Sequence, residues 1–199
     1  VIILSVYLLI NNSSDFSLMS VFFNTISILT GTGYVSAEFD GWGSFPLTLF
    51  LALMFIGGCA GSTTCGIKIF RIQILYLFIS NQIKKIIYPK GVFPIKYDQN
   101  SVDDKFIASI ISFIYLYFVI FFALTALLSL TGLDFITAIS GAATSISNVG
   151  PGLGPIIGPN GDFSSLPDIS KWILTIGMIL GRLELFAILV LFLPSFWRN

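Results

Sequence analysis

The chain has 199 residues, of which 55% are hydrophobic, 15% are aromatic and only 10% are charged. Soluble domains carry roughly 25% charged residues, so this composition, with a mean hydropathy of +0.93, excludes an ordinary soluble domain and a disordered chain and indicates an integral membrane protein. Ten basic residues balance ten acidic ones and histidine is absent, which leaves no electrostatic basis for nucleic-acid binding and excludes catalysis or metal binding by histidine.

The first half of the chain consists of the end of a span, a short helix, a turn and an interrupted span. Residues 1–10 are apolar over about half the ~20 residues that a span needs, so we expect the chain to start inside a transmembrane helix and to be the C-terminal part of a longer protein. Residues 15–29 begin with Asp, a good helix N-cap, and their length favours a re-entrant pore helix. A turn follows at 30–34, and small residues at 57–66 interrupt the apolar segment 45–80.

A basic loop at 81–105 separates the two halves. Residues 68–105 hold seven basic residues and three acids, whereas 11–45 and 131–170 each hold three acids and no base. The excess of Lys and Arg places the loop on the cytoplasmic side, and both short helices then enter the membrane from outside. A Lys-Lys pair in this loop suits anionic lipid or a partner protein, although setting the topology explains it equally well.

The second half repeats the order of the first. Residues 106–130 form a span, 134–146 a second short helix that starts after Asp, 147–151 a second turn and 172–193 a final span. The two turns align at an offset of 117 residues and the units run in the same direction, which predicts parallel repeats about an axis along the membrane normal. The expected fold class is therefore an all-α integral membrane protein with two span–pore-helix–span repeats.

The turns after the two short helices carry the predicted chemistry. A half-helix aimed at the membrane centre directs the negative end of its dipole there, and an extended turn beyond it presents carbonyl oxygens that replace the hydration shell of an alkali ion. Glycine permits the backbone conformations that such a turn needs, so Gly33 and Gly150 are pivotal. An ordinary helix C-cap is the alternative at each turn. The two turns concerned run from Thr30 to Tyr34 and from Ser147 to Pro151.

The run of small residues at 57–66 predicts a loop within the membrane. A continuous helix there would lose about 1 kcal/mol at each glycine, and helix breaks at membrane depth are tolerated only against protein or water. A flexible loop below the ion site, able to gate it, is one interpretation, and close helix packing through small residues is the other. The predicted gate residues of this loop are Gly57, Gly58, Gly61, Ser62, Thr63 and Gly66.

Arg182 and Glu184 place two charges in the last span. Charges inside a membrane usually face the bundle interior and mark a pathway. Because residues i and i+2 are about 200° apart on a helix, we do not expect the two to pair. Arg182 on the pore side would repel cations and act as a barrier or gate latch, with Glu184 on the packing side. Snorkelling to the interface is the alternative for both.

Several motifs resemble the Trk/Ktr/HKT potassium transporters, most closely the membrane subunit of the bacterial Trk form. These motifs are Thr32-Gly33-Tyr34, Gly57-Gly58-Cys59-Ala60-Gly61-Ser62-Thr63, Lys68, Asn148-Val149-Gly150-Pro151-Gly152 and Gly181-Arg182-Leu183-Glu184-Leu185-Phe186. The resemblance covers essentially the whole chain. It implies four span–pore-helix–span repeats around one potassium-selective filter, with residues 1–80 as the third repeat and 106–199 as the fourth. Two of the four filter strands would be Gly31-Thr32-Gly33-Tyr34 and Asn148-Val149-Gly150-Pro151.

The resemblance also implies roles for particular residues and partners. Potassium would bind the backbone carbonyls of Thr32, Gly33, Val149 and Gly150, while the 57–66 loop and Arg182 would gate the path. It implies a homodimer docked on a cytoplasmic, TrkA-like nucleotide-binding regulatory subunit. Cys65 departs from the family pattern, because it stands where the family often has another glycine.

We therefore expect a multi-pass protein of the bacterial cytoplasmic membrane that takes up K⁺, contacts membrane lipid and needs no covalently bound cofactor. An ion-coupled secondary transporter for Na⁺ or H⁺ is one alternative, with Glu184 as its candidate protonatable group. A non-conducting assembly subunit is another. A membrane enzyme is disfavoured, since the sequence lacks the paired carboxylates or nucleophile–base set that such chemistry needs.

Overall fold

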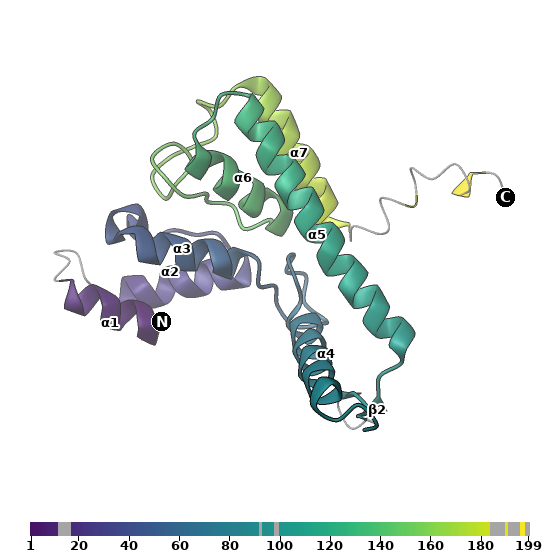
Figure 1. Cartoon of the computed structure of the whole chain (residues 1–199). Helices are drawn as coiled ribbons and strands as arrows, with labels where there is room; N and C mark the ends of the chain where they lie inside the picture. The colour runs from purple at the N-terminus through teal and green to yellow at the C-terminus, as the bar shows by residue number, and fades with distance from the viewer. Residues whose placement is uncertain (12–16, 92, 98–99, 184–189, 191–195, 198–199) are drawn as a thin grey trace.

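A computed structural model of the chain is mostly helical (Figure 1). It describes residues 1–11, 17–91, 93–97, 100–183, 190 and 196–197. The helices are α1 (Ile2–Ile10), α2 (Leu18–Thr30), α3 (Ser44–Met54), α4 (Ile69–Ile87), α5 (Asp104–Leu130), α6 (Phe135–Ser147) and α7 (Asp168–Arg182), with a 3₁₀ turn η1 (Phe39–Trp42) and two short strands, β1 (Lys96–Tyr97) and β2 (Asn100–Ser101).

The two short helices α2 and α6 match in length and in chain position. Each has 13 residues, and their first residues, Leu18 and Phe135, are 117 positions apart. At α6 the carboxylate of Asp134 accepts the Thr137 N–H at 3.2 Å, as expected of an N-cap. The N-cap of α2 is Ser17, not the residue predicted from the sequence. The expected capping residue, Asp15, lies outside the described residues.

Only α5 among the described helices is long and apolar enough to cross a bilayer, while α2, α3 and α6 are shorter apolar helices. The expected span 45–80 is divided, because α3 ends at Met54 and α4 begins at Ile69. The last expected span begins earlier than predicted, at Asp168, and much of its remainder lies outside the described residues.

The loop expected at 81–105 is more ordered than predicted. Helix α4 continues into it as far as Ile87, and the antiparallel pair of β1 and β2 follows (Figure 1). The expected loop therefore contains the end of a helix and a short strand pair, within a structure that is otherwise mostly helical. Lys84 and Lys85 lie in the last turn of α4, where basic side chains interact favourably with the negative end of the helix dipole.

Helix α6 lies in the core of the second half, against α5 and α7 (Figure 1). Small residues permit this close approach: Ala138, Ala142 and Ala143 are fully buried on α6. A Cβ added at Gly181 of α7 would overlap the Ile146 carbonyl oxygen. Close packing through small residues thus occurs between α6 and α7, which holds the end of α6 in place.

Candidate functional site

The first turn leaves α2 through a left-handed cap at Gly31, which has φ 69° and ψ 20°. The Thr32 N–H then donates to the Ser27 carbonyl oxygen at 3.0 Å. The Ser27 hydroxyl donates to the Tyr34 carbonyl oxygen at 2.6 Å. The last turn of α2 therefore fixes both ends of the Thr32–Tyr34 segment.

The second turn is built in the same way, 117 residues later. Asn148 caps α6 in the left-handed conformation, with φ 52° and ψ 43°. The Val149 N–H donates to the Thr144 carbonyl oxygen at 3.1 Å. This bond corresponds to the one from Thr32 to Ser27 in the first turn, because both residues lie 117 positions later in the sequence. The Gly150 N–H donates to the Thr144 hydroxyl at 2.9 Å. One residue of α6 thus holds two consecutive amides of the turn.

The two turns meet at their glycines. A Cβ added at Gly33 would overlap the Val149 carbonyl oxygen and lie 3.2 Å from Cδ of Pro151. A Cβ added at Gly150 would lie 3.7 Å from the Gly33 Cα. Both glycines have positive φ, +77° and +118°, a region that disfavours any other residue. Segments far apart in sequence therefore approach so closely that only glycine fits at residue 33.

Hydrogen bonds to the neighbouring helices support the second turn from behind. The Tyr117 hydroxyl of α5 and the Ser147 hydroxyl lie 2.7 Å apart, and both residues are buried. The Asn148 side-chain amide donates to the Met178 carbonyl oxygen of α7 at 3.0 Å. The turn is consequently held by α5, α6 and α7 together.

Sequence reasoning missed the polar side chains that align both turns against their helices. On α2, the Asn24 side-chain oxygen accepts the Ser36 N–H at 3.0 Å. On α6, the Ser140 hydroxyl accepts the Leu153 N–H at 3.0 Å. In the sequence, each short apolar helix carries two such polar residues, spaced three positions apart on α2 and four positions apart on α6, so that both lie on one face of the helix. These side chains, at most 5% exposed, are Asn24, Ser27, Ser140 and Thr144.

The predicted gating segment forms a loop with a closed base. The Gly57 N–H donates to the Ile67 carbonyl oxygen, and the Ile67 N–H donates to the Phe55 carbonyl oxygen, each at 2.9 Å. A Cβ at Gly57 would lie only 2.6 Å from the Cys65 carbonyl oxygen, while Gly61 has nothing within 4 Å of its added Cβ. The alternative of a continuous, closely packed helix through 57–66 is therefore wrong.

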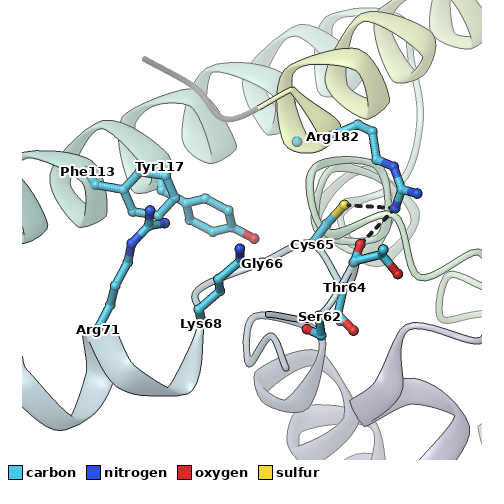
Figure 2. A pocket seen from close by; sticks show the side chains of 11 residues that line it. Ser62, Thr64, Cys65, Gly66, Lys68, Arg71, Phe113, Tyr117 and Arg182 are labelled. Atoms are coloured by element: carbon cyan, nitrogen blue, oxygen red, sulfur yellow. Dashed lines mark hydrogen bonds between the residues drawn. The ribbon is translucent and has the colours of Figure 1, made fainter. Parts of the chain in front are cut away.

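Arg182 reaches this loop from the end of α7. Its guanidinium Nη1 donates to the Thr63 carbonyl oxygen at 2.9 Å and lies 3.8 Å from the Cys65 sulfur (Figure 2). The arginine and the loop line a cavity of about 270 Å³. The other intramembrane charge of the sequence, Glu184, lies outside the described residues.

The loop also touches the first turn. The Thr64 hydroxyl donates to the Thr30 carbonyl oxygen at 3.4 Å. Its methyl carbon lies 3.4 Å from the position of a Cβ on Gly31. The sequence-predicted residues thus come together as one continuous group, with two turns in contact, the loop against the first of them and Arg182 against the loop.

Comparison with known proteins adds independent evidence. Residues 10–199 match the TrkH family, described as cation transport proteins. The chain is 46% identical to the Trk system potassium uptake protein TrkI of Halomonas elongata over 183 residues, which cover 92% of this chain and 37% of that protein. It is 34% identical to the Trk system potassium uptake protein TrkH of Escherichia coli K12 over 202 residues, which cover 100% and 41%.

The structural comparison agrees. The crystal structure of the potassium transporter TrkH from Vibrio parahaemolyticus matches with a TM-score of 0.89 at 34% identity, over 99% of this chain and 42% of that one. The chain thus spans about two fifths of the length of these relatives. The resemblance expected from the motifs is confirmed, and the chain belongs to the TrkH family of cation transport proteins.

Proposed function

We propose that the chain contributes two backbone strands of a potassium-selective filter and that the protein takes up K⁺ across the cytoplasmic membrane. The observation that carries this proposal is the contact between Gly33 and the Val149 carbonyl oxygen, which brings two oxygen-rich turns together at the ends of two short helices. The relatives named as potassium uptake proteins supply the identity of the ion.

The proposed ligands are backbone carbonyl oxygens of Thr32, Gly33, Val149 and Gly150. Carbonyl dipoles replace the hydration shell of an alkali ion. The C-terminal ends of α2 and α6 lie at the same place and add negative potential there. Closing a ring around an ion needs further strands, which the expected four-repeat arrangement of the full-length protein would supply.

The proposed gate is the 57–66 loop together with Arg182. The arginine's hydrogen bond to Thr63 and the contact of Thr64 with Thr30 support it, because they link α7, the loop and the first turn. In the proposed closed state, the guanidinium would present a positive charge to an approaching cation. Moving the loop would have to break that charge-assisted bond.

The proposed setting is a multi-pass protein of the bacterial cytoplasmic membrane. A homodimer and a nucleotide-binding regulatory subunit are the proposed partners. The basic end of α4 and the β1–β2 pair that follows lie together at one end of α5 (Figure 1). They offer a cytoplasmic face for such a partner or for anionic lipid.

The test is Gly33→Ala in the full-length gene product, expressed in bacteria that lack their own K⁺ uptake. The added methyl must displace the Val149 carbonyl oxygen, and φ +77° strains it further. We expect the preference for Rb⁺ and K⁺ over Na⁺ to fall about tenfold, which corresponds to ~1.4 kcal/mol. The readout is ⁸⁶Rb⁺ uptake with and without competing Na⁺, normalised to the amount of protein in the membrane.

Gly41→Ala is the matched control. Gly41 has open space around its added Cβ and its φ is not positive, so the same chemical change should leave uptake and ion preference as in the wild type. Unaltered ion preference in Gly33→Ala would contradict the filter. A wild-type protein that transports neither Rb⁺ nor K⁺ would contradict the proposed function as a whole.

A further inference from the structure

The segments that follow the two turns are joined by one acidic side chain. Asp40 lies in η1, six residues beyond Tyr34 of the first turn. Its Oδ1 accepts the N–H of Gly154 at 3.2 Å. Gly154 lies three residues beyond Pro151 of the second turn. The carboxylate thus bridges two halves of the molecule that are 114 residues apart in sequence.

The position of Asp40 is fixed by its own segment. Its neighbour Phe39 is fully buried, and Trp42 is 8% exposed. The Phe39 ring lies 4.8 Å from the Phe50 ring of α3, centroid to centroid, and the Trp42 ring lies 6.1 Å from it. These ring contacts hold η1 against α3 and thereby fix the position of the Asp40 carboxylate.

The segment that receives Asp40 is equally constrained. The Gly152 N–H donates to the Ile157 carbonyl oxygen at 2.7 Å, and the Gly158 N–H donates to the Gly154 carbonyl oxygen at 2.9 Å. A Cβ added at Gly158 would overlap Oδ2 of Asp40. The carboxylate therefore fits into a compact loop with one oxygen bonded and the other in contact with glycine.

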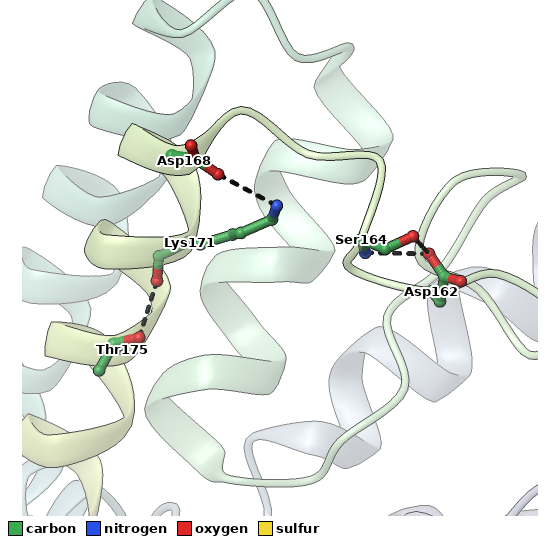
Figure 3. Close-up of polar contacts among 5 residues, drawn as sticks. All are labelled: Asp162, Ser164, Asp168, Lys171 and Thr175. Carbon is green, nitrogen blue, oxygen red and sulfur yellow. Dashed lines mark hydrogen bonds and ion pairs between the residues drawn. The ribbon is translucent and has the colours of Figure 1, made fainter.

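A second contact lies beside the first. The Asn160 side-chain amide donates to the Glu38 carboxylate across the same boundary. Farther along, the described contacts of this segment are local: Asp162 accepts from the N–H and the hydroxyl of Ser164, and Lys171 pairs with Asp168 at 3.2 Å (Figure 3). Of these contacts of the segment beyond the second turn, the two made by Asp40 and Glu38 come from the first half of the chain.

We propose that Asp40 is a positioning residue for the filter, which sets the distance between the two turns by holding the Gly154 amide. This inference rests on the proposed function. Gly150 is held by Thr144 on α6, and Leu153 by Ser140 on the same helix. Of the residues that make these three contacts to the second turn and the segment after it, Asp40 is the one that belongs to the first half of the chain. It therefore contributes to the placement of the second turn against the first, while the Thr144 and Ser140 hydroxyls fix the shape of the second turn and of the segment after it.

Attraction of cations by two carboxylates is the competing explanation, and it makes different predictions. A purely electrostatic role would be lost equally in Asp40→Asn and Glu38→Gln. It would raise the KM for Rb⁺ in a salt-dependent way and leave ion preference unchanged. A positioning role needs an oxygen acceptor at residue 40 rather than its charge, so the amide of Asp40→Asn should substitute for the carboxylate.

The experiment compares Asp40→Ala, Asp40→Asn and Glu38→Gln in the full-length gene product. In Asp40→Ala we expect the preference for Rb⁺ over Na⁺ to fall at least threefold at equal membrane abundance. Asp40→Asn should restore it, and Glu38→Gln should leave it unchanged. Wild-type preference in Asp40→Ala would overturn the inference, as would equal, salt-dependent KM increases in Asp40→Asn and Glu38→Gln.

A second variant and a measurement that does not depend on transport test the same contact. Gly158→Ala places a methyl group against both the Asp40 carboxylate and the Gly154 carbonyl oxygen, so it disturbs the same contact from the other side and should reproduce the loss of preference if Asp40→Ala does not accumulate in the membrane. Amide hydrogen exchange of residues 152–158 should rise in Asp40→Ala and not in Asp40→Asn, whether or not the protein carries ions. Unchanged exchange in Asp40→Ala overturns the inference. Absent wild-type uptake overturns only the proposed function.

Discussion

Thr144 holds the second turn with both its backbone and its side chain. Its carbonyl oxygen accepts the Val149 N–H and its hydroxyl accepts the Gly150 N–H at 2.9 Å. Thr144→Val has almost the same shape but leaves that second amide without its partner, a loss of about 1–3 kcal/mol. We expect a lower midpoint of thermal unfolding and weaker discrimination against Na⁺.

Thr144→Ser is the matched control, because it keeps the hydroxyl and removes only the methyl. It should retain most of the wild-type unfolding midpoint. If the valine and serine variants behave alike in unfolding and in ⁸⁶Rb⁺ uptake, then the hydroxyl does not support the turn and the lost methyl packing accounts for both.

Single residues were predictable where their chemistry is local. Gly33 and Gly150 could be selected because a turn that presents carbonyl oxygens needs glycine, and both have positive φ. Asn24 and Ser140 could not be selected, because the value of a buried polar side chain depends on which distant amide returns to meet it. Here those amides belong to Ser36 and Leu153.

At the scale of elements, Arg182 connects helix α7 to the loop between α3 and α4. The charge-assisted bond to Thr63 is of a kind worth about 1.5–3 kcal/mol. If it holds a gate closed, Arg182→Ala should favour the open state, and ⁸⁶Rb⁺ uptake by the unstimulated full-length protein should rise roughly tenfold. If Arg182 faces the ion path as proposed, removal of its positive charge would act in the same direction.

Lys171→Ala provides the control for Arg182→Ala. It removes a cation from the same helix, at an exposed pair with Asp168, and exposed pairs contribute little. Uptake in this variant should equal that of the wild type. A fall in uptake in Arg182→Ala at unchanged membrane abundance would mean that the arginine supports the conducting state instead of closing it.

The order of elements was predictable and several of their boundaries were not. Apolar length and capping signals identified the segments that became α2, α5 and α6. The end of α4 was misplaced because the predicted boundary rested on the change from apolar to polar residues, whereas residues 82–87 are exposed and still helical. The two-residue strands that follow carry no periodic signal long enough to detect.

At the scale of the whole molecule, the repeat was visible in the sequence and the meeting of its units was not. The offset of 117 residues aligned the turns, and the same offset relates their hydrogen bonds to Ser27 and Thr144. Part of the contact between the halves is made by the turns of the repeat itself, at Gly33 and Val149, and part by side chains outside the repeat pattern. Asp40 and Glu38 belong to a connection that the sequence indicated only as acidic.

Asp40 also makes the stability of the whole molecule depend on pH. Burial raises the pKa of its carboxyl above 3.8, the charge of Glu38 raises it further, and the Gly154 N–H opposes both. Since the folded-state pKa is the higher one, folding favours the protonated carboxyl. Its contribution to stability is complete below the pKa of the unfolded chain and is lost as the pH rises through the folded-state value.

The difference in unfolding midpoint between the wild type and Asp40→Asn should therefore shift in favour of the wild type as the pH falls from about 7 to about 4. Asn does not titrate, so subtracting its midpoint at each pH cancels every other titrating group. Thermal unfolding of the purified full-length protein in detergent measures the difference. Replacing Glu38 by Gln should reduce the shift, because one of its two causes is removed. A difference that stays constant, or that moves toward the variant in acid, would mean that partial burial and the charge of Glu38 do not raise the pKa of the Asp40 carboxyl.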